Sequence, residues 1–516
     1  MASENGALPG GKVGGVADVL RDLPPAIARR NCRVSVVTPS YGTLHELEGM
    51  TRQGTVDVPF AGHVHEVDVY AQNGKQVTQI VLDHGLFAPT TPGLVYHDDG
   101  ADRPYATDAG KFAFLGSAAA AWVLSQDPLP ALVHLHDWHA AFYLLRREFD
   151  PAAAALKSIR TVFSIHNLAY QGQRPFRGDA SSLETWFPDL EIDEAPLADP
   201  HIADCLNPMA FAIRAADAVN TVSPSYAREI CRPSDPGRGF FGGEGLEEDL
   251  QAIALKTQLS GILNGCEYPA TRQPVPGWQR VLSTLRKQAE GWLAGLPEGS
   301  PLAALHQLAL ERIADLPKRR PLHVLTSIGR LVAQKASLLL EPVADTHGDR
   351  YPTALDAILE NMGKQGVLIL VGSGEADLEA AVAEVARRHA NFVFMNGYSE
   401  TAAGPLYRGG DLFLMPSSFE PCGISQMLAM RDGQPCVVHG VGGLSDTVAD
   451  GETGFVFHGG APAEQAGAFV RCVDRALEFR AGNPIKWAGL VQRAEQQRFD
   501  WDRAAADYMR QLYEFA

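Results

Sequence analysis

The sequence contains no long apolar run, and we expect no secretory leader. No stretch approaches the roughly 20 apolar residues that a membrane-spanning helix needs, so we expect no membrane partner. Met1 is followed by Ala-Ser-Glu-Asn, which lacks the basic start and apolar core of a secretory signal. We therefore predict a cytoplasmic protein.

Cysteines are few and scattered. There are 7 of them, an odd number, and none is spaced as C-x-x-C, the pattern that zinc and redox sites commonly use. We expect most of them to be buried thiols. The sequence accordingly predicts no metal site and no cofactor.

Positive charge is in deficit. The formal net charge is −17 and the isoelectric point lies near 5.4, whereas nucleic acids bind surfaces of net positive charge. We therefore predict no nucleic-acid partner. A neutral ligand, or a small anion held by a local cluster of Lys and Arg, remains compatible with this composition.

The chain does contain a regular alternation of short β-like runs with Ala- and Leu-rich helical stretches. Its 516 residues exceed one ordinary core at about 150 residues per domain, and we expect two large domains. The rhythm predicts an α/β fold with two doubly wound sheets, in which ligands lie at the carboxyl ends of the strands. The predicted strands are Arg33–Val37, Val64–Tyr70, Gln79–Leu82, Leu132–His136, Thr161–Ile165, Ala218–Val222, His323–Ser327, Gly366–Val371, Phe392–Met395, Asp411–Met415 and Cys436–His439.

The stretch from Asp411 to Asp446 has the order of a binding site. An apolar strand ends in a polar turn that carries Glu420, and a helix opens at Gly423-Ile424-Ser425. Unpaired N–H groups at such a helix start can hold an anion such as a pyrophosphate. An ordinary connection between strand and helix is the alternative interpretation.

A second candidate anion site lies near the N-terminus. The segment Gly10–Gly15 carries Lys12 and precedes a predicted helix over 16–29, with a kink expected at Pro24-Pro25. Glycines let the backbone approach a phosphate and Lys adds a point charge, although a flexible terminus would look the same. Only Met1 to Leu8 precede this loop, so either the usual first strand is minimal or the chain begins late.

Two strands of the first half end in polar and aromatic residues. Leu132–His136 is followed by Asp137-Trp138-His139, and Thr161–Ile165 by His166-Asn167 and Tyr170. Such a mixture suits a sugar, whose hydroxyls need hydrogen bonds and whose C–H faces rest on aromatic rings. Zinc binding by Asp137, His139 and His166 is the competing interpretation, and it lacks the helical H-E-x-x-H spacing. A structural role is the simplest for any single His.

Two cations follow the first strand of the second half. Arg330 and Lys335 could hold a diphosphate, with Arg330 gripping two oxygens at once; two solvated surface cations are the alternative. Tyr398, after another strand, could stack on a base. The Pro-rich stretch Pro269–Pro276 indicates a linker, and the helical segment Trp278–Leu316 carries no recognisable function.

Eight motifs together resemble the bacterial glycogen synthase and plant starch synthase family of retaining glucosyltransferases. They occur in the family's order across nearly the whole chain: K-V-G-G-V-A-D-V, H-D-W-H-A, H-N-L-A-Y-Q-G, V-S-P-S-Y-A-R-E-I, G-I-L-N-G, G-R-L-V-A-Q-K, G-Y-S-E and F-E-P-C-G-I-S-Q. The resemblance implies a GT-B fold, in which two Rossmann-like domains face each other across a cleft. It also implies transfer of glucose from ADP-glucose, or less readily UDP-glucose, to the non-reducing 4-hydroxyl of an α-1,4-glucan.

The resemblance assigns roles to matching positions. The residues implied in catalysis are His166, Arg330, Lys335 and Glu420. Those implied in donor binding are Lys12, Gly14, Gly15, Tyr398, Gly423, Ile424 and Ser425. Those implied around the acceptor or the reacting sugar are Asp18, Tyr96, Asp137, Asn167 and Asn264. Same-face attack and a covalent route through Glu420 or His166 are both compatible with these assignments.

The expected domains follow from the same comparison. Residues 1–268 form an acceptor-side domain of the starch synthase catalytic type, 269–320 a linker and helical segment, and 321–494 a nucleotide-sugar domain. Residues 495–516 form a C-terminal helix, beginning at Trp501 and reaching Glu514, that crosses back to the first domain. A divergent non-catalytic, glucan-binding or regulatory paralogue is the alternative, suggested by the short N-terminus and by Cys266-Glu267-Tyr268 in the linker. A phosphorylase would need a pyridoxal-phosphate lysine, for which no motif is present.

Overall fold

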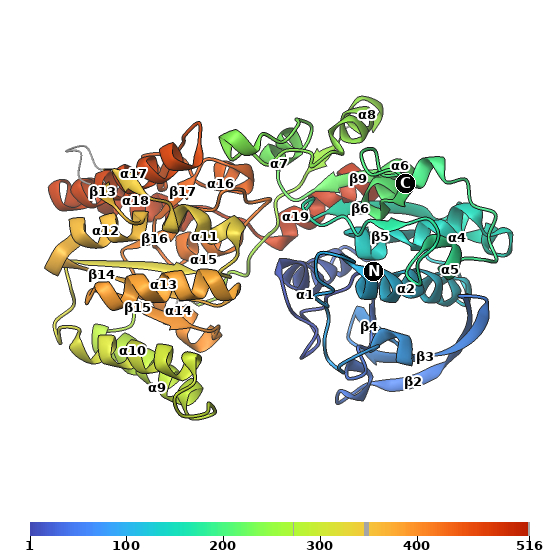
Figure 1. Cartoon of the computed structure of the whole chain (residues 1–516), viewed down its shortest axis with the longest axis horizontal. Coiled ribbons are helices and arrows are strands. Elements are labelled where there is room, and N and C mark those ends of the chain that lie inside the picture. Colours follow the sequence, from blue (N-terminus) through green and yellow to red (C-terminus); the bar gives the residue numbers. More distant parts are fainter. Residues whose placement is uncertain (258, 272, 345–349, 514–516) are drawn as a thin grey trace. The chain divides into compact units, whose positions relative to one another are not determined.

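The chain folds into two compact units in a computed structural model that describes residues 1–257, 259–271, 273–344 and 350–513. The first unit comprises Met1–Ser234, Gly242–Gly265 and the C-terminal segment from Asp500, and the second comprises Asp235–Phe241 and Cys266–Phe499. Figure 1 labels their elements. No helix in the described ranges has both the length and the apolarity that crossing a bilayer would require.

The second unit is built on one parallel sheet of six strands in the order β15-β14-β11-β16-β17-β18. Strands β14 to β17 are buried throughout, which explains why their sequences are continuous apolar runs. The five strands predicted in this half are confirmed, and β18 was missed because three residues carry too little pattern. The bounds are β11 His323–Ile328, β14 Gly366–Gly372, β15 Phe392–Asn396, β16 Leu412–Met415, β17 Cys436–His439 and β18 Phe455–Phe457.

Helices cover both faces of this sheet. On β14, Leu368 and Leu370 point to one face, while Val367, Ile369 and Val371 point to the other, as the two-residue period of a strand requires. The first face packs against α11 (Ala333–Leu340), α12 (Ala354–Met362), α13 (Ala376–Arg388) and α17 (Pro462–Gly482). The second packs against α9 (Trp278–Leu293), α10 (Pro301–Asp315), α14 (Glu400–Gly409) and α15 (Ser425–Arg431). The predicted doubly wound architecture is therefore confirmed here.

The first unit contains two four-stranded sheets. One is parallel, in the order β10-β9-β6-β5, and the other is mixed, in the order β1-β4-β3-β2. In the mixed sheet β1 and β4 are parallel, whereas β2, β3 and β4 form antiparallel neighbours. The bounds are β1 Val34–Pro39, β2 Thr51–Phe60, β3 His63–Asn73, β4 Val77–Asp83, β5 Leu132–His136, β6 Arg160–Ile165, β9 Ala218–Thr221 and β10 Ser260–Gly261.

Strand β2 and its antiparallel pairing were not predicted. Its sequence is mostly polar, with a Gly and a Pro that resemble turn residues, and it is half exposed because it lies at the edge of its sheet. The six strands predicted in this half are confirmed as β1, β3, β4, β5, β6 and β9; β5 has the predicted bounds, and no end of the others is shifted by more than three residues.

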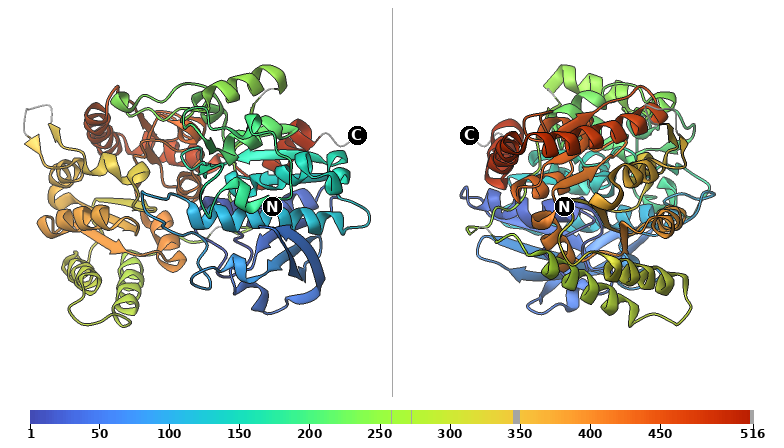
Figure 2. Two further views of the ribbon diagram at one scale, coloured as in Figure 1. Left: turned by 45° about the vertical axis from the view of Figure 1, so that its right-hand side comes forward. Right: turned by 90° about the vertical axis from the view of Figure 1, so that its left-hand side faces the viewer.

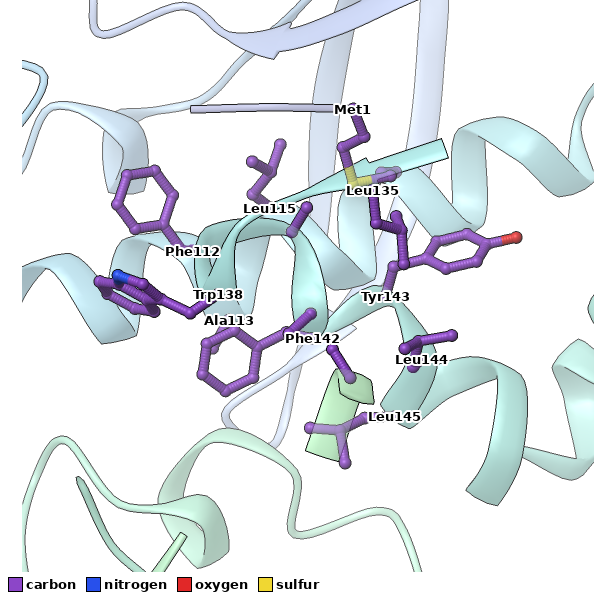
Figure 3. Close-up of a cluster of buried hydrophobic side chains, with 14 of the residues drawn as sticks. Met1, Phe112, Ala113, Leu115, Leu135, Trp138, Phe142, Tyr143, Leu144 and Leu145 are labelled. Atoms are coloured by element: carbon purple, nitrogen blue, oxygen red, sulfur yellow. The ribbon is translucent and has the colours of Figure 1, made fainter. Parts of the chain in front are cut away.

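Met1 and Ala2 lie between β1 and β5 and connect the two sheets. The backbone N–H of Ala2 donates to the Val37 carbonyl over 3.3 Å, and the N–H of His136 donates to the Met1 carbonyl over 3.1 Å. The Met1 amine donates to the His134 carbonyl over 2.7 Å. Figure 3 shows the Met1 side chain near Leu135 in the hydrophobic core of this unit. These two residues thus occupy the position of a strand between the sheets.

Helix α1 (Gly15–Ala28) follows the Gly-rich loop and continues through Pro24 and Pro25. It packs against α19 (Trp501–Tyr508), which belongs to the first unit, in a cluster that includes Leu23 and Tyr508. A π-helical turn continues from Met509 to Tyr513. Glu514, the predicted helix end, and residue 272 in the predicted linker lie outside the described residues.

Candidate active site

The carboxyl edge of the second sheet is formed by loops that hydrogen-bond to one another. The loop after β11 joins the loop after β14, because Leu331 N–H donates to the Ser373 carbonyl over 2.9 Å. The first turn of α11, which follows that loop, joins the loop after β16, because Ser418 N–H donates to the Gln334 carbonyl over 2.8 Å. These bonds hold three strand ends together as one surface, at the position where an open α/β sheet binds its ligands.

Arg330, Lys335 and Glu420 come together on this surface. The Lys335 ammonium donates to Glu420 Oε2 over 2.8 Å, and the Ser417 hydroxyl donates to the same oxygen over 3.0 Å. Arg330 and Lys335 line a cavity of about 30 Å³ together with Ser417. Glu420 is only 6% exposed, so its carboxylate depends on these donors. Two cations and one carboxylate at a strand edge can bind an anion and a neighbouring hydroxyl group.

The turn that carries Glu420 leads directly into α15, as the sequence predicts. Gly423 has φ +75°, and a Cβ there would lie 2.5 Å from the Gln426 side chain, so this position requires glycine. The helix begins at Ser425, with Ile424 as its N-cap residue. Gly443, near the start of α16 (Gly442–Thr447), donates its N–H to the Glu420 carbonyl over 3.0 Å, which holds the start of that helix against the turn.

Tyr398 follows β15 on the same edge. Its side chain is 58% exposed, and the N–H of the preceding Gly397 donates to the Gly372 carbonyl at the end of β14 over 3.2 Å. The loop is therefore attached to its neighbour while the tyrosine ring remains largely accessible.

In the first unit, Glu4 connects the Gly-rich loop to Tyr96. One oxygen of its buried carboxylate accepts hydrogen bonds from the backbone N–H groups of Val13, at 3.0 Å, and of Gly14. The other accepts from the Tyr96 hydroxyl over 2.9 Å. Sequence reasoning missed Glu4, because its hydrogen-bond partners Val13 and Tyr96 lie 9 and 92 positions further along the chain.

Lys12 and Asp18, both predicted site residues, form an ion pair of 2.7 Å across the same loop. Asp18 also lies 2.9 Å from Arg21 one turn along α1. Gly15 is the first residue of this helix, and among the described residues no heavy atom outside its chain neighbours and the backbone of the helix lies within 4 Å of the position where a Cβ would lie. In this structure the loop is therefore stabilised by carboxylates of the chain itself, through Glu4 on the backbone and Asp18 on Lys12.

Asp137, His166 and Asn167 meet where β5 and β6 end. Asp137 has φ +56°, an unusual value for a residue other than glycine. Its Oδ1 accepts hydrogen bonds from the N–H groups of His166 at 2.7 Å and Asn167 at 3.4 Å. Burial raises the pKa of the Asp137 carboxyl to about 7, although these two N–H groups oppose the shift.

His166 is held by a second histidine. Its Nε2 lies 2.9 Å from Nδ1 of His136, and burial lowers the pKa of His166 to about 4. His139 instead stacks on Trp138, with ring centroids 4.3 Å apart, and burial lowers its pKa to about 3. Within the described ranges, no group of three His, Cys, Asp or Glu residues is placed to hold a metal ion.

Asn264 lies just beyond β10 in the first unit. Its side chain is 6% exposed, and its Oδ1 has no hydrogen-bond partner among the described residues. A buried carbonyl oxygen without a hydrogen-bond donor costs stability. Such an atom is found where a ligand supplies the missing donor on binding. This geometry is compatible with the sugar contact that the sequence predicts for Asn264.

Models of known protein families match residues in both units. The family model described as the starch synthase catalytic domain matches residues 1–252, and the one described as glycosyl transferases group 1 matches residues 324–475. A glycogen synthase of Anaeromyxobacter sp. (strain Fw109-5) is 34% identical over 524 residues, which cover 98% of this chain and 97% of that protein.

Solved structures agree on the fold. The catalytic domain of starch synthase IV from Arabidopsis thaliana, bound to ADP and acarbose, has a TM-score of 0.75 at 24% identity and covers 99% of this chain and 97% of its own. A sucrose-phosphate synthase from Thermosynechococcus elongatus has a TM-score of 0.56 at 17% identity, with coverage of 97% and 93%. At these identities the likeness establishes the GT-B fold alone, which confirms the predicted fold class.

Proposed function

Because this chain belongs to the glycogen synthase family of glycosyltransferases, we propose that it transfers glucose from ADP-glucose to the non-reducing 4-hydroxyl of an α-1,4-glucan. The observation that carries this proposal is the arrangement of Arg330, Lys335 and Glu420 on one sheet edge. The choice of ADP-glucose is supported by the related starch synthase structure, which was solved bound to ADP and acarbose.

The cations act on the leaving group. Breaking the bond between glucose and a nucleoside diphosphate builds negative charge on the departing phosphate, which preplaced cations stabilise. Arg330 can grip two phosphate oxygens, and Lys335 supplies a compact charge. Backbone N–H groups at Gly423, Ile424 and Ser425 add donors at the start of α15.

Lys335 must be shared during the reaction. Its ammonium contacts Glu420 in this structure. Because the ammonium has three N–H groups, it can donate to a bound diphosphate and to the Glu420 carboxylate together. We assign Glu420 to the donor glucose. Because Glu420 lies beside Lys335, the sugar subsite is then adjacent to the phosphate subsite. Tyr398 is assigned to the base.

The first unit supplies the remaining roles. Lys12, Gly14 and Gly15 are assigned to the donor, and His166 to a position beside the transferred sugar. Asp18, Tyr96, Asp137, Asn167 and Asn264 are assigned to the acceptor or the reacting glucose. In same-face attack the departing phosphate takes the proton of the acceptor hydroxyl, and configuration is retained. A covalent route would need Glu420 or His166 as nucleophile and two successive displacements.

A donor screen tests the proposal. The purified protein is incubated with ADP-, UDP- or GDP-glucose and with glycogen or maltooligosaccharide primers, and release of nucleoside diphosphate is measured together with primer elongation. We expect the highest turnover with ADP-glucose, undiminished by EDTA. New linkages should be cleaved by an enzyme specific for α-1,4 bonds.

Two results would contradict the proposal. Absence of elongation with every donor and primer, from protein that still binds glucan, would favour the non-catalytic paralogue. A clear preference for UDP-glucose would keep the family reaction and change the donor. The cytoplasmic location expected from the sequence remains part of the proposal.

A further inference from the structure

The helices α9 and α10 form a pair that lies beside β15 and α14 in the second unit (Figures 1 and 2). Their buried residues join the core on one face of the sheet, including Leu285 of α9 and Ile313 of α10. The same pair reaches beyond the core to the turn that follows β15, where Tyr398 lies. The helix pair therefore does more than cover the sheet: α9 also contacts the turn around Tyr398.

Gln288 of α9 fixes the residue that follows Tyr398. The Ser399 hydroxyl donates to Gln288 Oε1 over 2.7 Å. The same hydroxyl accepts a hydrogen bond from the Ala402 N–H as the N-cap of α14. One side chain thus ties the start of α14 to α9, directly beside the tyrosine.

Trp292 of α9 lies against the residue that precedes Tyr398. Gly397 has φ +151°, and a Cβ at this position would lie 2.9 to 3.1 Å from three atoms of the Trp292 indole. The backbone therefore rests on the indole ring at a distance that only glycine permits. The indole also lies near the buried ring of His306 from α10, with 5.4 Å between the ring centroids.

The other side of the turn is held by Glu379 of α13. One oxygen of its carboxylate accepts from the Asn396 amide over 2.9 Å, and the other accepts from the Gly374 N–H over 2.6 Å. The turn is thus fixed from two directions, while the Tyr398 side chain is 58% exposed. A fixed backbone that presents an accessible aromatic ring reduces the entropy lost when a planar ligand stacks on it.

We propose that Gln288 and Trp292 are positioning residues that hold the Gly397–Ser399 turn so that Tyr398 can stack on the nucleobase of the donor. This inference rests on the proposed function, because it concerns the base subsite of that reaction. The base lies far from the bond that breaks, so its contacts stabilise the ground state and the transition state equally. Such uniform binding changes KM and leaves kcat nearly unchanged.

The test compares Gln288→Ala and Trp292→Ala with Gln307→Ala. Gln307 is the matched control: it is exposed on α10, and its amide donates to Glu311 of the same helix over 3.2 Å. We expect each loop-facing variant to raise the donor KM and the Kd for ADP about tenfold, equivalent to one lost contact. Their kcat should stay within about twofold. Trp292→Phe retains an aromatic ring and should restore most of the affinity.

The outcomes are separable. If Gln288→Ala and Trp292→Ala match Gln307→Ala in KM and in ADP affinity, the inference is wrong. A fall in kcat at constant KM, parallel to a lower melting temperature, would also overturn it, because that pattern reports general destabilisation. If the unmodified protein elongates no primer, the proposed function fails, whereas ADP binding by calorimetry still tests the positioning role separately. Gln288→Ala removes a hydrogen bond from a partly exposed site, so it provides a variant that folds.

Discussion

The Lys335 ammonium lies 2.8 Å from Oε2 of Glu420, so the residue assigned to the leaving phosphate is paired with the residue assigned to the sugar. The Glu420 side chain is 7% exposed and that of Lys335 is 24% exposed. Removing either charge therefore has two effects, one on folding and one on the reaction. The variants that follow are designed to separate these effects.

Replacing Lys335 by Ala should cost both stability and turnover. It leaves a buried carboxylate with the Ser417 hydroxyl and without its cation, which should lower the free energy of unfolding by about 1–3 kcal/mol. Turnover should fall by roughly 100-fold or more, as for other preplaced groups that stabilise transition-state charge. Thermal melts and initial rates measure the two losses.

The control is Lys364→Ala, which changes an exposed lysine before β14. Glu420→Gln keeps the shape of the side chain and removes the buried charge, so it should lose turnover with a smaller loss of stability. Turnover of Lys335→Ala or Glu420→Gln close to that of Lys364→Ala would exclude these residues from the active site.

Replacing Glu4 by Ala should loosen the Gly-rich loop. The N–H groups of Val13 and Gly14 lose their acceptor and Tyr96 loses a hydrogen-bond partner. We expect a loss of about 1–3 kcal/mol in the free energy of unfolding and a higher donor KM. Glu4→Gln retains one acceptor oxygen, so its stability and its donor KM should lie between those of the unmodified protein and those of Glu4→Ala. The melting temperature and the donor KM report the effects.

Glu46→Ala is the matched control, because the side chain of Glu46 is 74% exposed. If Glu4→Ala and Glu46→Ala had equal donor KM values, Glu4 would have no part in holding the loop for the donor.

The Asp137 carboxyl should make stability depend on pH. Its pKa is about 7 in the folded protein and 3.8 in a model peptide, so the folded state binds this proton more tightly. The contribution to stability is fully present below about pH 4, falls as pH rises to about 7 and is constant above that. At about 1.4 kcal/mol per pKa unit, the change amounts to a few kcal/mol.

Asp137→Asn removes this titration. The melting temperature of the variant, minus that of the unmodified protein, should therefore increase between pH 4 and pH 7 and level off above pH 7, while turnover is lost at every pH. Asp57→Asn, at an exposed position of β2, is the control. A difference that stayed constant over this pH range would show that the Asp137 pKa is not raised.

Gly172→Ala should be among the most damaging substitutions in the first unit. Gly172 has φ +73°, and a Cβ there would lie 2.2 Å from the ring of Trp138, which is 2% exposed. Gly178 has a similar φ of +77°, and among the described residues no heavy atom beyond its two chain neighbours lies within 4 Å of the same position.

Gly178→Ala therefore measures the backbone cost alone, about 1 kcal/mol, and Gly172→Ala adds a steric clash with a buried ring. We expect Gly172→Ala to lose at least about 3 kcal/mol more in the free energy of unfolding, measured by denaturant titration. Equal losses in the two variants would mean that Trp138 moves aside without cost.

The second unit was more predictable than the first for a physical reason. Strands buried on both faces must be apolar throughout, so Gly366–Val371 and Cys436–His439 are recognisable from composition alone. Edge strands such as Thr51–Phe60 need only one apolar face and can contain Gly and Pro, so their sequences resemble loops. The antiparallel order of β2, β3 and β4 is set by two short connections, residues 61–62 and 74–76, and it was missed because β2 itself was not recognised.

The candidate site divides in the same way. That Arg330, Lys335 and Glu420 lie at one edge could be predicted, because each lies within seven residues of the end of a recognisable strand and strand ends of a parallel sheet meet at one edge. The roles of Glu4, Gln288 and Trp292 could not be predicted, because each acts through a partner between 9 and 111 positions away or through a single glycine contact.

By itself, the sequence determined the α/β class, the family and the identity of the side chains placed at the strand ends, since these depend on local pattern and on motifs in a fixed order. Only the tertiary structure decided which of those side chains pair. Lys335 pairs with Glu420 and Asp137 receives the N–H of His166, because each contact needs two separate strand ends to lie within hydrogen-bond distance. Burial, which raises the pKa of Asp137 and leaves the Asn264 oxygen unsatisfied, is likewise a property of the assembled core.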